Sequence, residues 1–142
     1  MRQRAPNSRP VGRARLARHK FFIMPSGFAS VKRDAHADVH GVLFDLALSD
    51  VPALDRYEEV GRGLYTKTVQ PVLRDGAAPV RALVYIGATL AEGKPTASYL
   101  QMILSGAKEN SLPEDYIAFL AACGGVDAGQ GTRWRAIKAR DI

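Results

Sequence analysis

The chain has 142 residues, 46% of them hydrophobic, which is typical of one globular domain that buries a core without disulfides or metals. Its single cysteine, Cys123, excludes an intramolecular disulfide and favours a reducing, cytoplasmic setting. No apolar run approaches the length of a membrane span, and the N-terminus lacks the apolar centre of a secretory signal.

The net charge of +6 is unevenly distributed along the chain. Residues 1–33 hold nine Lys and Arg and no acidic residue, whereas the rest holds eleven basic and fourteen acidic residues. A basic front end can contact nucleic acid, but the first twenty residues contain no aromatic ring that would stack on bases. We therefore interpret residues 1–12 as an irregular basic leader, and nucleic-acid binding is the less favoured role.

Four strands are expected, mostly in the first two thirds of the chain. Apolar alternation and β-branched residues predict them over 13–24, 38–48, 64–73 and 80–86. The connection 26–37 is expected to be a loop, and Gly41 to mark a bulge or a close backbone approach. Asp75 and Gly76 are typical of a hairpin turn between the last two strands.

Helices are expected between and after these strands. Ser49 as a cap and Pro52 in the first turn predict a short helix. Two further helices are predicted, over 96–107 and 113–122. With strands mostly first and helices mostly last, the expected fold class is α+β, a small and mostly antiparallel, barrel-like sheet with flanking helices. We place this domain at 13–122, with a C-terminal tail at 123–142.

One segment is the first candidate for chemistry. Leu-Asp-Arg-Tyr-Glu-Glu-Val (54–60) ends the first helix in acidic residues, and Gly-Arg-Gly-Leu-Tyr (61–65) follows directly. This order can place a carboxylate at the mouth of the sheet, and Glu58 is the candidate acid/base. Alone the pattern is weak, because many surface helices end in Glu-Glu. A second segment adds weight: Tyr99, then Gly-Ala-Lys-Glu-Asn-Ser-Leu-Pro (106–113) and Tyr116.

Together with Asp-Val-His-Gly-Val-Leu-Phe (38–44), these segments resemble the gamma-glutamylcyclotransferase family (AIG2-like fold) over about residues 13–120. The resemblance implies a closed or nearly closed sheet and a lyase without metal or organic cofactor. The α-amine of a small γ-glutamyl substrate attacks its own γ-carbonyl, which releases 5-oxoproline and an amino acid. Glu58 would be the general acid/base, taking the ammonium proton and passing it to the leaving nitrogen. Tyr99 and Tyr65 would be the substrate-binding residues, Tyr99 by contacting the substrate and Tyr65 by lining the cavity.

One family feature has no counterpart in this sequence. The family normally begins with a strand ending in Tyr-Gly-Ser-Asn, whose loop amides cradle the substrate, and the sequence contains no such motif. A missing strand would leave an open sheet edge. The alternative function is therefore a catalytically inactive, truncated member of the fold that acts as a binding or interaction module. A homodimer is compatible with either function, and no membrane association is expected.

The remaining candidates have simpler interpretations. His19, His36 and His40 are not spaced as ligands on one element, so no metal site is expected. Cys123 has no identifiable base nearby, so an idle thiol is expected. Without the resemblance, Tyr65 and Tyr99 would be taken as packing residues at the edge of the core.

Overall fold

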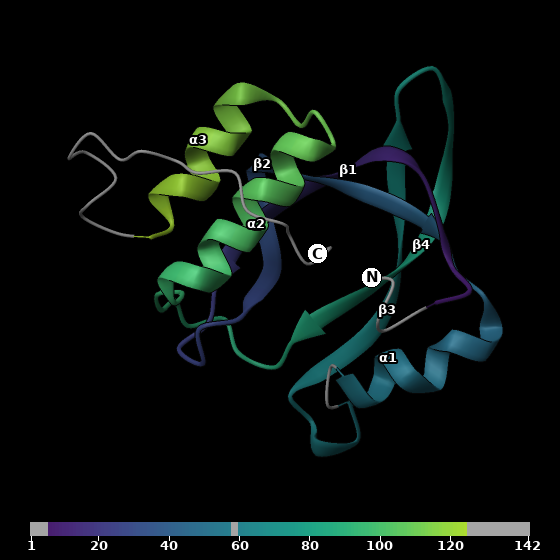
Figure 1. The fold of residues 1–142 in the computed structure, drawn as a ribbon, viewed down its shortest axis with the longest axis horizontal. Coiled ribbons are helices and arrows are strands. Elements are labelled where there is room, and N and C mark those ends of the chain that lie inside the picture. Colours follow the sequence, from purple (N-terminus) through teal and green to yellow (C-terminus); the bar gives the residue numbers. More distant parts are fainter. Residues whose placement is uncertain (1–5, 58–59, 125–142) are drawn as a thin grey trace.

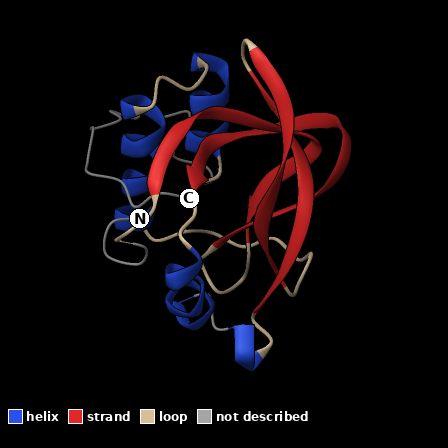
Figure 2. Cartoon of the chain, turned by 90° about the vertical axis from the view of Figure 1, so that its right-hand side faces the viewer, coloured by secondary structure: helices blue, strands red, loops and turns tan. Residues whose placement is uncertain are grey.

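The computed structural model describes residues 6–57 and 60–124, and Figure 1 shows its arrangement. The elements are β1 (Arg9–Ile23), β2 (Ala29–Asp45), a 3-10 turn (Leu48–Asp50), α1 (Val51–Tyr57), a second 3-10 turn (Val60–Arg62), β3 (Tyr65–Arg74), β4 (Ala77–Gly87), α2 (Ala97–Glu109) and α3 (Glu114–Ala122). Helices α2 and α3 pack together beside the sheet, whereas α1 lies apart from them (Figures 1 and 2).

The four strands form one antiparallel sheet in the order β2-β1-β3-β4. Strand β1 pairs with β2 along most of its length, but only Ala14 and Arg15 pair with β3. The sheet is therefore two long hairpins joined over a short stretch. Within the described residues it is not closed, and β2 and β4 are its edges. The predicted α+β class is confirmed.

The first hairpin is longer than the sequence predicts. Strand β1 begins at Arg9, inside the expected irregular leader, and β2 begins at Ala29, so the predicted loop 26–37 is mostly strand. These polar stretches lack apolar alternation, and their strand conformation comes from pairing with each other. Gly41 pairs in regular register with Ala14, and none of the described residues comes within 4 Å of a Cβ built on it. The prediction of a bulge or close approach at Gly41 is wrong.

An irregularity does occur nearer the hairpin turn. Ala17 pairs with Asp38 and His19 with Arg33, so Arg18 alone faces residues 34–37. Arg18 adopts a left-handed conformation (φ 58°), and its N–H donates to the Asp38 carboxylate at 3.3 Å. Such a bulge interrupts the side-chain alternation, which explains why this part of β2 does not look like a strand in the sequence.

The hydrophobic core lies between β1 and the two long helices. Phe21 and Ile23 of β1 pack against α2, where Leu104 is fully buried. The core continues into α3 and the turn before it through Leu112, Tyr116, Leu120 and Ala121. The start of α2 is held by Thr96, whose side-chain oxygen accepts from the Tyr99 N–H at 3.2 Å. This packing sets the position of Tyr99 relative to the sheet.

Candidate functional site

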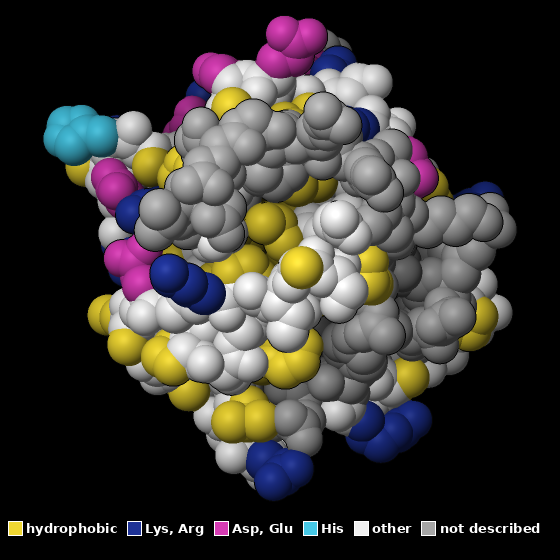
Figure 3. Space-filling model, turned by 60° about the vertical axis from the view of Figure 1, so that its left-hand side comes forward, with side chains coloured by type: hydrophobic (Ala, Val, Ile, Leu, Met, Phe, Trp, Pro, Cys, Tyr) yellow, Lys and Arg dark blue, Asp and Glu magenta, His cyan; other side chains and the backbone are white. Residues whose placement is uncertain are grey.

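A cavity of about 1050 Å³ is lined by residues of all four strands and of helices α1 and α2. Its lining is mostly aliphatic and aromatic, with few polar side chains, as is usual for ligand pockets. The polar or titratable side chains in the lining are those of Ser26, Ser30, His40, Tyr65, Arg81, Tyr85, Thr89 and Tyr99. Figure 3 shows one face of the molecule in space-filling form. Hydrophobic side chains are visible across this face of the molecule, and charged side chains lie mainly toward its rim.

Two of the predicted site residues meet in this cavity at Ala29. The Tyr65 hydroxyl, at the start of β3, donates to the Ala29 carbonyl oxygen at 2.8 Å. The Ala29 N–H donates to the hydroxyl oxygen of Tyr99, in the first turn of α2, at 3.2 Å. The fold thus brings together two phenol groups that lie far apart in the sequence.

These two bonds give the phenols opposite hydrogen-bonding roles. Tyr65 donates its hydroxyl proton to the Ala29 carbonyl oxygen. In any further hydrogen bond, the Tyr65 hydroxyl oxygen is therefore the acceptor. Tyr99 accepts from the Ala29 N–H, which directs its own proton to a different acceptor. Both hydroxyls therefore lie at the Ala29 end of a mostly apolar cavity.

Neighbouring contacts hold this end of the cavity together. The Phe28 ring meets the Tyr99 ring edge to face, with centroids 5.5 Å apart. The buried Ser30 hydroxyl accepts the Gly87 N–H at 2.9 Å and so joins β2 to the end of β4. A Cβ on Gly87 would meet the end of the Met24 side chain and lie 3.1 Å from Ser30 Oγ, so side chains pack closely around this position.

Asp55 attaches helix α1 to the second hairpin. Its carboxylate accepts from Lys67 Nζ of β3 at 2.7 Å and from the Tyr85 hydroxyl of β4 at 2.8 Å. The hydrogen bond from Lys67, with a smaller effect from Tyr85, lowers the pKa of Asp55, so this group remains a carboxylate at neutral pH. Tyr85 also lines the cavity, which links its wall to α1.

The central predicted residue, Glu58, lies outside the described residues. Tyr65 and Tyr99 are placed as stated above, whereas Ala29, Ser30 and Asp55 were not expected from the sequence. Ala29 lies in a stretch predicted to be a loop, and nothing local indicates that two distant tyrosines bind it. Asp55 does lie in the acidic segment 54–60 that contains Glu58. That segment is the only sequence feature that indicated a functional role close to Asp55.

The three histidines do not come together. His19 is buried and its Nδ1 lies 2.8 Å from the Ala17 carbonyl oxygen, while the His40 ring packs against Tyr116 with centroids 4.8 Å apart. In the described part of the chain, no three His, Cys, Asp or Glu side chains are grouped so that they could hold a metal ion. No helix there is both long and apolar enough to cross a membrane.

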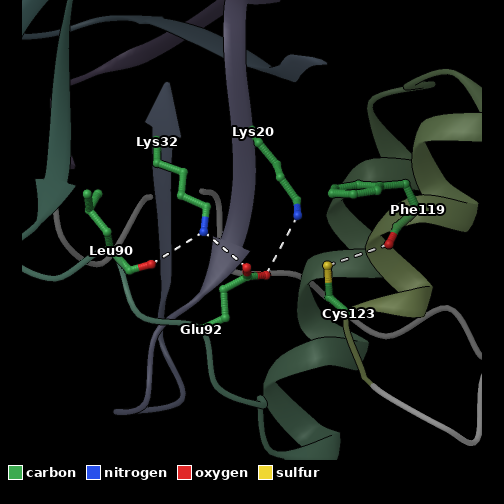
Figure 4. A network of polar contacts seen from close by, with 6 residues as sticks. All are labelled: Lys20, Lys32, Leu90, Glu92, Phe119 and Cys123. Carbon is green, nitrogen blue, oxygen red and sulfur yellow. Dashed lines mark hydrogen bonds and ion pairs between the residues drawn. The ribbon is translucent and has the colours of Figure 1, made fainter. Parts of the chain in front are cut away.

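Cys123 lies beside a polar network formed by Lys20, Lys32 and Glu92 (Figure 4). Its thiol donates to the Phe119 carbonyl at 3.5 Å, and burial raises its pKa, so it stays protonated and is a poor nucleophile. Glu92, in the connection between β4 and α2, pairs with Lys32 at 3.1 Å and Lys20 at 3.7 Å. These contacts attach that connection to the first hairpin.

Comparison with known proteins assigns this chain to a family. Residues 38–120, more than half of the chain, match the AIG2-like family. The chain belongs to the AIG2-like family. The matched region includes β3, β4 and α2, and therefore Tyr65 and Tyr99 but not Ala29.

Relatives of this AIG2-like chain carry a more specific name. Gamma-glutamylcyclotransferases of mouse and human are 28% identical to it over 90 residues, which cover 63% of this chain and 48% of the relative. The chain thus spans about half the length of these curated relatives. A structure titled gamma-glutamyl cyclotransferase matches with a TM-score of 0.78 and 25% identity, over 85% of this chain and 78% of that one. An uncharacterized human protein matches over the same shares, at 0.78 and 26%. The family predicted from the sequence is confirmed.

Proposed function

We propose that this AIG2-like chain is a gamma-glutamylcyclotransferase-like lyase that acts on small γ-glutamyl compounds. The observation that carries the proposal is the convergence of the Tyr65 and Tyr99 hydroxyls on Ala29 inside a largely apolar cavity. The names of the relatives support the same reaction. A zwitterionic γ-glutamyl group suits this pair, because it carries an ammonium donor and oxygen acceptors.

The reaction needs one proton carrier and no added water. The substrate α-amine nitrogen bonds to its own γ-carbonyl carbon, and the bond from that carbon to the amide nitrogen breaks. The products are 5-oxoproline and a free amino acid. Glu58 takes two protons in turn from the α-nitrogen, one before it attacks and one as the lactam forms. It returns them to the departing nitrogen, so the amino acid leaves with its ammonium group. Tyr65 accepts a hydrogen bond from the substrate amine, and Tyr99 donates one to a substrate oxygen.

The described structure also supports a role for the segment that contains Glu58. This residue directly follows α1, and Asp55 holds that helix to β3 and β4 through Lys67 and Tyr85. A carboxylate used as an acid/base must be held within reach of its proton. The polar contacts of Asp55 supply a rigid support for this purpose.

The test is the release of 5-oxoproline from γ-glutamyl-alanine, measured by mass spectrometry. Removal of an acid/base typically costs about 100- to 10,000-fold in rate, so Glu58→Gln should lose nearly all release. Glu59→Gln is the matched control, since it removes the adjacent carboxylate, and it should retain activity. If the folded chain releases no 5-oxoproline, or if Glu58→Gln remains fully active, the proposal is wrong.

A further inference from the structure

Arg81 of β4 is the one side chain with a permanent charge in the described lining of the cavity. That lining contains no Asp, Glu or Lys, and Arg81 is its only arginine. The other basic side chain there, His40, packs its ring against Tyr116, with centroids 4.8 Å apart. The proposed contacts of the substrate with Tyr65 and Tyr99 make no use of a cation, so the charge of Arg81 is available for another part of the substrate.

The guanidinium of Arg81 has no acceptor among its neighbours. Within the described ranges 6–57 and 60–124, Arg81 makes no ion pair and no side-chain hydrogen bond. The lining residues that follow it, Ala82, Leu83 and Val84, have side chains without polar atoms. A guanidinium carries five N–H donors, and it binds a carboxylate through two parallel hydrogen bonds. A carboxylate is therefore the ligand group that suits this part of the cavity.

The position of Arg81 along β4 matches the length of a γ-glutamyl amino acid. Gly87 pairs with Tyr65, and Arg81 lies six residues before Gly87, which is at most about 20 Å along the strand. The chain from the α-amine of the γ-glutamyl group to the carboxylate of the leaving amino acid spans about 10 Å. An extended arginine side chain and one hydrogen bond cover roughly the other 10 Å. A substrate held at Tyr65 can thus present its second carboxylate to Arg81.

We propose that Arg81 is a specificity-determining residue that binds the free carboxylate of the leaving amino acid. The inference rests on the proposed cyclotransferase function and narrows its substrates to γ-glutamyl compounds whose leaving amine bears a carboxylate. The apolar residues 82–84 beside Arg81 suit an apolar side chain on that amino acid, as in γ-glutamyl-leucine. Because Arg81 is exposed, solvent screens its charge, and we expect a preference of about 10-fold for the carboxylate.

Two ligands that differ only in this charge test the proposal. Calorimetry compares the binding of γ-glutamyl-leucine and γ-glutamyl-leucinamide to the whole chain carrying Glu58→Gln, which prevents turnover in the proposed reaction. The same two ligands are measured after Arg81→Gln is added. Arg33→Gln is the matched control, because it removes an exposed arginine that does not line the cavity. Circular dichroism confirms that each variant is folded.

The Kd of γ-glutamyl-leucine should be about 10-fold lower than that of the amide. Arg81→Gln should abolish this difference, and Arg33→Gln should preserve it. Equal Kd values before Arg81 is changed, no binding of either ligand, or a preference that survives Arg81→Gln would overturn the proposal. Release of 5-oxoproline from γ-glutamyl-leucine by the wild-type chain tests the proposed function separately. Release without a carboxylate preference would refute only the role of Arg81, whereas no release would refute the reaction itself.

Discussion

Tyr65 and Tyr99 bind the two polar groups of one residue, since Tyr65 donates to the Ala29 carbonyl and Tyr99 accepts from the Ala29 N–H. Each bond joins the start of β2 to a different element, β3 in one case and α2 in the other. The pair therefore supports the cavity wall where β2, β3 and α2 come together.

Replacing the two tyrosines separately should give different kinetic effects. In the proposed reaction Tyr99 donates to a substrate oxygen, so for Tyr99→Phe we expect kcat to fall by about 10-fold or more. In the same proposal Tyr65 accepts from the substrate amine, so for Tyr65→Phe we expect the larger change in KM. Steady-state 5-oxoproline release measures both. Equal effects of the two variants on both constants would contradict the assigned roles.

Tyr116→Phe should leave the protein as stable as it is, or more stable. Tyr116 is 7% exposed, and its hydroxyl makes no hydrogen bond within the described residues, although it lies toward the His40 main chain. Burial accordingly raises the pKa of Tyr116. An unpaired buried hydroxyl costs about 1–3 kcal/mol, so its removal should not lower the free energy of unfolding in urea. A loss of more than about 1 kcal/mol would show that the hydroxyl has a partner.

Asp55→Asn should weaken the attachment of α1, and the effect should depend on pH. The folded-state pKa of Asp55 is lowered, so its stabilising effect is complete above the unfolded pKa of about 4 and is lost as pH falls through the folded value. Urea unfolding should therefore separate wild type from Asp55→Asn at pH 7 and bring them together near pH 2. Asp75→Asn is the control, because Asp75 is 91% exposed and 3.8 Å from Arg13. A difference between wild type and Asp55→Asn that persists at low pH would argue against this account.

Gly93→Ala should be clearly destabilising. A Cβ at this position would lie 2.6 Å from the Met24 carbonyl oxygen and 2.6 Å from Pro25 Cα, and neither main-chain atom can move aside easily. The Gly93 N–H also donates to Ile23 at 2.6 Å, which fixes the connection against the hairpin. Overpacking of this kind costs about 1–3 kcal/mol, measured by urea unfolding. Gly61→Ala, where nothing lies within 4 Å, is the control, and equal losses for the two variants would refute the argument.

Much of the fold follows from local sequence signals. The Asp75-Gly76 turn, with Gly76 at φ 67°, joins β3 to β4 as predicted, because a tight hairpin needs a residue that tolerates positive φ. Helices α2 and α3 begin within one residue of their predicted starts. Capping and apolar periodicity act within a few residues, so they can be recognised without knowing the rest of the structure.

The sequence by itself thus determined the α+β class, the family and two of the tyrosines that line the cavity. Only the tertiary structure decided that β2 begins at Ala29, that Tyr65 and Tyr99 meet there, and that Asp55 binds Lys67 and Tyr85. The physical reason is the range of the interactions. A polar strand gains its hydrogen bonds from a partner that is distant in the sequence. Ala29, for example, is bonded to Tyr65, which is 36 positions away, and to Tyr99, which is 70 positions away.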